Sequence, residues 1–152
     1  MPEIVLPVFG IGFLVREAFE IEKRLKEELD IPVMHDDQHG TAIISGAALI
    51  NALELADKKI DEVRFVISGA GAAAIACTNL YIALGADPEK ILMCDSKGVI
   101  NHKRTELSPE KLPFVRTTEL KTLEEAMKGS DVFIGLSKAD VVSPAMLKTM
   151  NE

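Results

Sequence analysis

Two stretches of this chain carry residues whose types and spacing could do chemistry. The first is a polar run that ends in a glycine and leads into an apolar helix, His35-Asp36-Asp37-Gln38-His39-Gly40-Thr41-Ala42. Two carboxylates and two imidazoles at the mouth of a buried helix are costly unless they have partners. On the residues alone two explanations stay open. The side chains cap the helix, or Asp37, supported by Asp36, ligates a hard divalent cation such as Mg²⁺ or Mn²⁺.

The two histidines of this run also have the spacing of a zinc-binding helix, because His39 follows His35 by four residues. Gly40 and the turn-forming residues around it argue against a helix there, which disfavours zinc. The sequence therefore predicts a turn, followed by a helix from Thr41 to Leu55. That helix is apolar on nearly all sides, which predicts burial between other elements.

The second stretch is a Gly-x-Gly-x-x-Ala turn between an apolar strand and an apolar helix. Gly69 allows a tight turn, Gly71 lets the backbone approach a pyrophosphate, and Ala74 lets the helix pack closely on a sheet. A second strand ends on Asp95, 24 residues after Gly71, close to where an acid would bond a ribose hydroxyl. The order predicts a dinucleotide site, and the alternative is a tight turn that binds nothing. From the residues alone, Gly69, Gly71 and Asp95 are predicted to bind the cofactor, and Ser137 follows a later strand at the same edge. The family resemblance described below adds Ala70, Ala72, Ala73, Ser96 and Lys97.

The order of strands and helices expected around these residues predicts an α/β fold. Strands are expected around residues 63–68, 90–94 and 131–136, in parallel order, with right-handed crossovers that place helices on both faces. This is a Rossmann-like parallel sheet, and about half of a doubly wound NAD(P)-binding domain is encoded. Ser137 and Lys138 follow the third strand, at the edge where ligands bind, although an ordinary loop is an equal alternative there.

The rest of the chain divides at residue 30. Residues 1–30 are expected to form an apolar N-terminal segment and an amphipathic helix, and residues 31–152 the cofactor domain, incomplete at its C-terminal end. Thr122 with Glu125 predicts a capping box, and Ser143 predicts the cap of a last helix. The basic residues of the connection after the second strand are expected to be surface charge, namely Arg104, Lys111 and Arg116.

Composition excludes several classes of function. At 152 residues, with 47% hydrophobic and 27% charged residues, the chain has the profile of one globular domain. A net charge of −7 and the absence of a basic run argue against a nucleic-acid partner. No apolar run long enough to span a membrane is present. Cys77 and Cys94 lie in apolar elements and indicate buried thiols in a reducing compartment, which predicts a cytoplasmic protein.

Several motifs in the same order resemble those of bacterial malic enzymes, most closely the type that elsewhere carries a phosphotransacetylase-like domain. They are the polar run with its flanks at residues 31–44, the glycine turn at residues 68–74, the Asp95-Ser96-Lys97-Gly98 stretch and residues 122–135. The resemblance covers roughly residues 17–150.

The resemblance implies an oxidoreductase that converts malate to pyruvate and CO₂ with NAD or NADP and with Mg²⁺ or Mn²⁺. Asp37 matches a metal-ligand carboxylate of the family, and Asp36 matches its neighbour, with a supporting catalytic role. Residues 69–73 match the pyrophosphate turn, and residues 95–97 match the region that meets the adenosine ribose.

The sequence also departs from the family pattern. Ile11 and Gly12 stand where the family has a Glu-Asp pair of metal ligands, and Tyr81 does not match the catalytic tyrosine. We therefore expect a fragment that is inactive alone and that forms a homo-oligomer through its N-terminal segment or an open sheet edge. The alternatives are a non-catalytic dinucleotide-binding module or a structural remnant.

Overall fold

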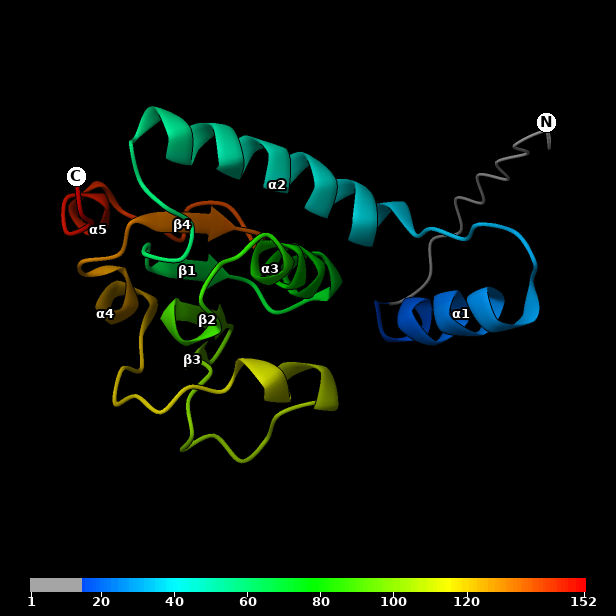
Figure 1. Cartoon of the computed structure of the whole chain (residues 1–152). Coiled ribbons are helices and arrows are strands. Elements are labelled where there is room, and N and C mark those ends of the chain that lie inside the picture. Colours follow the sequence, from blue (N-terminus) through cyan, green and yellow to red (C-terminus); the bar gives the residue numbers. More distant parts are fainter. Residues whose placement is uncertain (1–14) are drawn as a thin grey trace.

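The computed structural model describes residues 15–152, with side chains from Glu20 onward except those of Asp37 and Gln38. Its centre is a four-stranded sheet in the order β3-β2-β1-β4 (Figure 1). The predictions for the apolar N-terminal segment, including Ile11 and Gly12, fall on residues 1–14 and lie outside the described residues.

The three predicted strands are present and parallel. They are β1 (Phe65–Ser68), β2 (Ile91–Asp95) and β4 (Val132–Gly135). A short strand that the sequence did not predict, β3 (Gly98–Val99), returns antiparallel beside β2. A connection between parallel strands must cross over a face of the sheet. One helical connection leads from β1 to β2, and another leads from the β2–β3 hairpin to β4. The predicted α/β fold is confirmed.

Helices cover both faces of the sheet, namely α2 (Asp36–Leu55), α3 (Ala72–Ala83), α4 (Leu123–Met127) and α5 (Pro144–Leu147) (Figure 1). The helix α1 (Val15–Glu28) lies away from the sheet, and 3₁₀ turns form η1 (Pro88–Lys90) and η2 (Pro109–Phe114). Over residues 15–152, no helix combines the length and the apolar character that crossing a bilayer requires.

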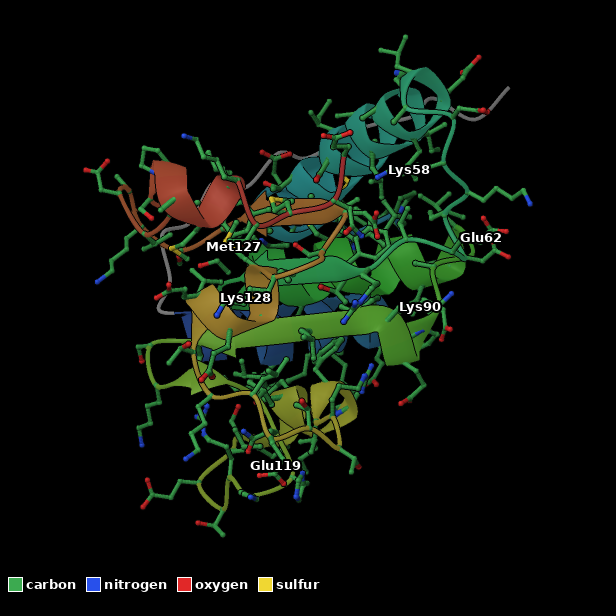
Figure 2. The ribbon with its side chains drawn as sticks, turned by 90° about the vertical axis from the view of Figure 1, so that its left-hand side faces the viewer. Lys58, Glu62, Lys90, Glu119, Met127 and Lys128 are labelled. Atoms are coloured by element: carbon green, nitrogen blue, oxygen red, sulfur yellow. The ribbon has the colours of Figure 1, made fainter. Side chains whose placement is uncertain are left out.

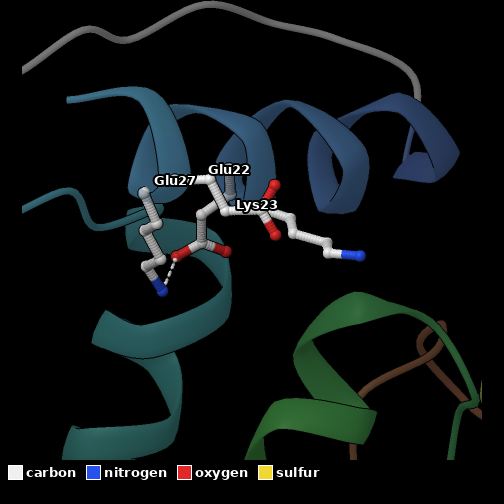
Figure 3. A pocket seen from close by; sticks show the side chains of 4 residues that line it. Glu22, Lys23 and Glu27 are labelled. Atoms are coloured by element: carbon white, nitrogen blue, oxygen red, sulfur yellow. Dashed lines mark ion pairs between the residues drawn. The ribbon is translucent and has the colours of Figure 1, made fainter.

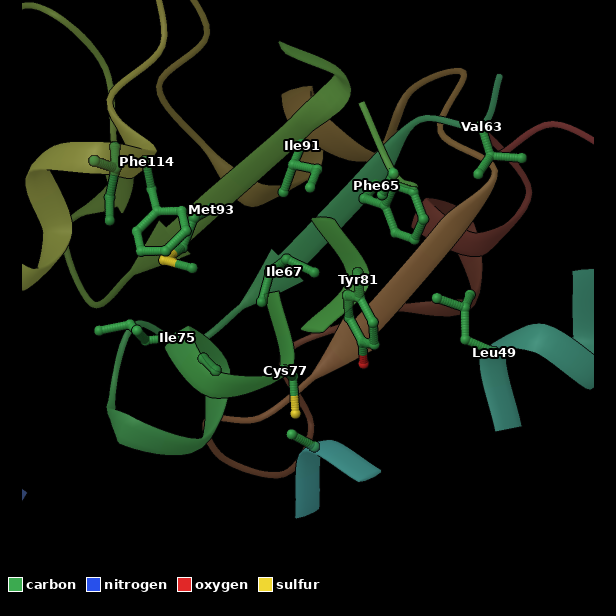
Figure 4. Packing of buried hydrophobic residues seen from close by; sticks show 14 of the residues in the cluster. Leu49, Val63, Phe65, Ile67, Ile75, Cys77, Tyr81, Ile91, Met93 and Phe114 are labelled. Atoms are coloured by element: carbon green, nitrogen blue, oxygen red, sulfur yellow. The ribbon is translucent and has the colours of Figure 1, made fainter. Parts of the chain in front are cut away.

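The central strand β1 divides the core into two clusters because its side chains alternate between the two faces of the sheet. Phe65 and Ile67 lie in the cluster formed with α2 and α3, and Phe65 stacks on Tyr81 with ring centroids 5.9 Å apart (Figure 4). Val66 lies in the other cluster, with Met127 of α4. Every residue of β1 is buried, so the sheet would expose apolar side chains to water if the helices on either face were removed.

The apolar helix α2 packs on α3 through one side only. Leu49 and Leu53 are buried, and Gly46 lies close to Leu80 of α3. On the other side Ile44 is 73% exposed and Leu55 is 90% exposed. The prediction that α2 is buried all round is therefore wrong for the described residues, because α3 and the sheet reach only one of its faces.

Local polar contacts fix the ends of the elements. The predicted capping box is present, with the Glu125 N–H donating to Thr122 Oγ1 at 3.1 Å and the Thr122 N–H donating to Glu125 Oε2 at 3.0 Å. Ser143 caps α5 as predicted. At the amino end of the sheet, Lys58 donates to Asp131 at 2.9 Å (Figure 2).

The turn between β2 and β3 generates a stability prediction. Gly98 has φ +101°, and a Cβ atom there would overlap the carbonyl oxygen of Lys121. We expect Gly98→Ala to lower the free energy of unfolding by about 3 kcal/mol, through backbone strain and overpacking together. Urea unfolding would measure the change.

The matched control for this substitution is Gly71→Ala. A Cβ at Gly71 meets nothing within 4 Å, and its φ of −91° suits any residue. The control should stay within about 0.5 kcal/mol of wild type. Equal stabilities for the two variants would contradict the assignment.

Candidate functional site

The glycine turn joins β1 to α3 at the carboxyl edge of the sheet. Gly69 has φ +129°, and a Cβ there would lie 2.6 Å from the carbonyl oxygen of Leu136. Its own N–H donates to the carbonyl of Cys94 at 2.8 Å. Gly69 is therefore required by contacts with both neighbouring strands, because only glycine tolerates this dihedral angle and this approach.

Gly71 occupies the N-cap of α3 and meets different demands. It is exposed, its missing Cβ would point into open space, and no side chain caps the helix. The first turn of a helix has N–H groups without intrahelical partners, and they carry the positive end of the helix dipole. Ala72 and Ala73 follow without any acidic side chain. These features suit an anion such as a pyrophosphate.

The ends of β1 and β4 bring two serines together. The Oγ atoms of Ser68 and Ser137 lie 3.0 Å apart, and Ser137 is exposed. The structure thus places the predicted Ser137 beside the glycine turn, at the edge where open α/β sheets bind ligands. Its role in binding a cofactor stays a prediction.

The predicted ribose-binding residues form a hairpin turn at the end of β2. Asp95 pairs with Gly98 across this hairpin, and Ser96 and Lys97 make the exposed loop. The Lys97 N–H donates to Asp95 Oδ1 at 2.9 Å, which orients the carboxylate. The Lys97 side chain turns to solvent and pairs with Glu106 at 2.9 Å.

Two cations hold the Asp95 carboxylate, and the sequence analysis misassigned both. Arg104 donates from Nη1 to Oδ1 and from Nη2 to Oδ2, each at 3.0 Å, and Lys111 donates to Oδ2 at 2.9 Å. The Asp95, Arg104 and Lys111 side chains are only 9%, 16% and 25% exposed. Burial acts to raise the pKa of Asp95, but the hydrogen bonds from Arg104, Lys111 and the Lys97 N–H outweigh it and hold that pKa well below its usual range.

The prediction that these basic residues are surface charge is therefore wrong. Arg116, the third of them, is buried and donates to the carbonyl oxygens of Pro88, Pro113 and Val115. Spacing along the chain gives no signal for these contacts. The sequence did contain one indication that Asp95 is paired. A carboxylate at the buried end of a strand requires a cationic partner.

The polar run lies in the first turns of α2, which begins at Asp36. The prediction of a turn there, with the helix starting at Thr41, is wrong. Gly40 lies inside this helix, where an added Cβ would meet only the exposed carboxylate of Asp36, a side-chain end that can move aside. The expectation that a glycine here ends the helix was therefore wrong.

Glu22 of α1 holds the start of α2. Its carboxylate is buried and lies 2.6 Å from His39 Nε2, while Lys26 donates to it at 2.7 Å (Figure 3). The His35 N–H also donates to it, at 3.4 Å. Burial acts to raise the pKa of Glu22, but the hydrogen bonds from Lys26 and His39 give a net lowering. This arrangement engages His39 with an acid and does not support the zinc interpretation.

The described side chains do not assemble a metal site. Among them no group of three or more His, Cys, Asp or Glu residues could hold an ion. Asp36 is an exposed carboxylate packed over Gly40. The side chain of Asp37, the predicted ligand, lies outside the described set. A single carboxylate does not meet the requirements of Mg²⁺ or Mn²⁺.

A groove of about 370 Å³ lies between α2 and α3. The residues that line it come from the first half of α2 and from the middle of α3, His39, Ala42, Ile43, Ile75, Ala76, Asn79 and Leu80. The polar run and the helix that follows the glycine turn therefore border one mostly apolar hollow. In chain order they are separate, and packing of α2 on α3 brings them together.

The ion pairs of Asp95 generate a pH prediction. Because the folded pKa of Asp95 lies below its ordinary value, the stabilisation is complete above an unfolded pKa of about 4 and is lost as the pH falls below it. We expect Asp95→Asn to lower the free energy of unfolding by about 2 kcal/mol at neutral pH. The gap from wild type should close in acid, and urea unfolding across a pH series measures it.

The control for this series is Glu119→Gln, which removes an exposed partner of Lys103. Exposed pairs contribute little, so this variant should follow wild type at every pH. A deficit for Asp95→Asn that stays constant into acid would contradict the role given to the carboxylate.

Comparison with known proteins agrees with this geometry. Residues 38–152 match the family model described as "Malic enzyme, NAD binding domain". The chain is 50% identical to a probable NADP-dependent malic enzyme of Rickettsia prowazekii, over 88% of this chain and 18% of the relative. It is 49% identical to an NAD-dependent malic enzyme of Rhizobium meliloti, over 90% of this chain and 18% of the relative.

A solved structure gives the same answer for the fold. The NAD-dependent malic enzyme of Thermotoga maritima superposes with a TM-score of 0.80 at 38% identity, over 88% of this chain and 37% of that one. This chain thus spans well under half the length of the relatives it matches. The family model covers most of the chain, so this chain belongs to the malic enzyme family, and its residues 38–152 correspond to the NAD-binding domain of that family.

Proposed function

We propose that this chain binds NAD(P) across the carboxyl ends of β1, β2 and β4. The observation that carries the proposal is the uncapped, exposed start of α3 at Gly71, where an added Cβ would meet no protein atom within 4 Å. The pyrophosphate would lie on residues 69–73, the adenosine ribose near Asp95, Ser96 and Lys97, and the dinucleotide would pass Ser137.

Within a complete malic enzyme, this domain would serve the oxidation of malate and the loss of CO₂ that leaves pyruvate. Bound NAD(P) would accept the hydride of that oxidation. The residues of this chain would bind and orient the cofactor, with Gly69 holding the turn between two strands. The groove between α2 and α3 would present the polar run to the same region.

The divalent metal that the family resemblance implies is not supported by the described donor set. A site at Asp37, with Asp36 in support, would require oxygen ligands from other parts of a complete enzyme. We therefore assign no step to a metal in this chain.

Oligomerisation and a cytoplasmic location stay predictions. The feature that supports association is the set of exposed apolar side chains on α2 outside the groove between α2 and α3, Ile44, Ile50 and Leu55. Apolar patches of this kind mark interaction surfaces.

The glycine turn generates the binding test. We expect Gly71→Ala to weaken NAD⁺ and NADP⁺ binding by about tenfold or more, because its methyl group would occupy the space where the backbone must approach the pyrophosphate. Calorimetric titration with both cofactors measures this effect. The melting temperature should be unchanged, because the same methyl group meets no protein atom within 4 Å.

The control is Lys148→Ala, an exposed position after α5, in a segment hydrogen-bonded to Gly129 and Ser130 before the amino end of β4; this variant should bind like wild type. Equal binding by Gly71→Ala and wild type would contradict the assigned site. Failure of the wild-type chain to bind either cofactor would contradict the proposed function itself.

A further inference from the structure

A polar contact lies within the apolar packing of α2 on α3. The hydroxyl groups of Ser45 on α2 and Tyr81 on α3 share a hydrogen bond, and Tyr81 is fully buried. Burial raises the pKa of Tyr81, so its phenol keeps its proton at neutral pH and can donate it to Ser45. The Cys77 thiol points the same way one turn earlier in α3 and interacts with both hydroxyls, but a thiol is a weak hydrogen-bonding partner (Figure 4).

Apolar burial alone does not decide which face of α2 meets α3. The positions of α2 that are buried on the α3 side are Ala42, Gly46, Leu49 and Leu53. Rotation of α2 by one residue position, about 100°, would present Ile43, Ala47 and Ile50 instead. This second face is as apolar as the first, so the area removed from water does not distinguish them.

The Tyr81 hydroxyl does distinguish between these faces. Ser45 lies on the face that is used, and it supplies the partner of the phenol. After a rotation in either direction, Ile44 or Gly46 would take the place of Ser45. Neither residue has a side chain that can accept a hydrogen bond. The buried phenol would lose its partner, which disfavours both rotated arrangements.

Gly46 adds a second criterion for the same face. A Cβ there would lie 2.9 Å from Cδ2 of Leu80, so the two helices approach each other closely at this point. That contact involves the flexible end of a leucine side chain, which can move aside. The close approach therefore selects the face less strictly than the hydroxyl pair does.

We propose that Ser45 and Tyr81 are positioning residues that select the face of α2 which packs on α3 and thereby place the polar run beside the groove. A buried polar pair can specify one arrangement of packed helices where apolar contacts leave several open. Rotation of α2 would turn His39 away from both the groove and Glu22. The inference goes beyond the proposed function, because it concerns the placement of α2 and does not depend on cofactor binding.

The alternative is that the pair contributes stability and nothing else. We would compare backbone amide NMR spectra of the full chain and of Tyr81→Phe, which removes only the hydroxyl. We expect the signals of residues 36–55 to double or broaden in the variant, because two faces of α2 then compete for α3. The signals of residues 65–71 should stay single. The melting temperature should fall by about 2–4 °C.

The matched control is Thr78→Val. Thr78 lies on the same helix and is also fully buried, but its hydroxyl donates to the carbonyl of Ala74 within α3, at 2.7 Å. Loss of this hydroxyl should leave one set of α2 signals. Ser45→Ala breaks the hydroxyl pair from the other helix, so it should reproduce the changes that Tyr81→Phe causes in α2.

Each outcome decides the question. A Tyr81→Phe variant with one sharp set of α2 signals would overturn the proposal, whatever its melting temperature. Doubling of the α2 signals in Thr78→Val would also overturn it, because loss of any buried hydroxyl of α3 would then loosen α2. If Tyr81→Phe does not fold, the spectrum of Ser45→Ala decides by the same criterion. Cofactor titration of the wild-type chain tests the proposed function separately.

Discussion

Burial of β1 on both faces is the constraint on which the rest of the structure depends. Phe65 and Ile67 require α2 and α3 on one side, and Val66 requires α4 on the other. β2 and β4 flank β1 as parallel neighbours, which is typical of a strand that helices cover on both faces. Because the three strands are parallel, their carboxyl ends lie at one edge of the sheet. The loops that follow β1, β2 and β4 therefore all begin at that edge.

That edge explains the contrast between the two glycines of the turn. Gly69 is wedged between β2 and β4, so its lack of a side chain serves the fold. Gly71 stands free at the start of α3, so its lack of a side chain serves no contact within the described residues. Binding of an anion at the start of α3 would explain why a glycine with open space around it precedes an uncapped helix.

A buried carboxylate lies at each end of the site, and each is paired with cationic or imidazole side chains. At the hairpin, Asp95 is surrounded by cations that come from residues 104 and 111, beyond β3. At the start of α2, the buried carboxylate comes instead from α1, where Glu22 engages His39. In both places a buried carboxylate has a partner from another part of the chain, because burying an unpaired ion would cost free energy.

The sequence by itself determined the family, the parallel α/β order and the glycine turn, because these depend on local patterns and on motifs read along the chain. It also identified the caps at Thr122 and Ser143, whose partners lie three residues away. Only the tertiary structure decided the helical start at Asp36, the open face of α2 and the partners of Asp95. Those features depend on which distant elements touch, and spacing along a chain carries no record of such contacts.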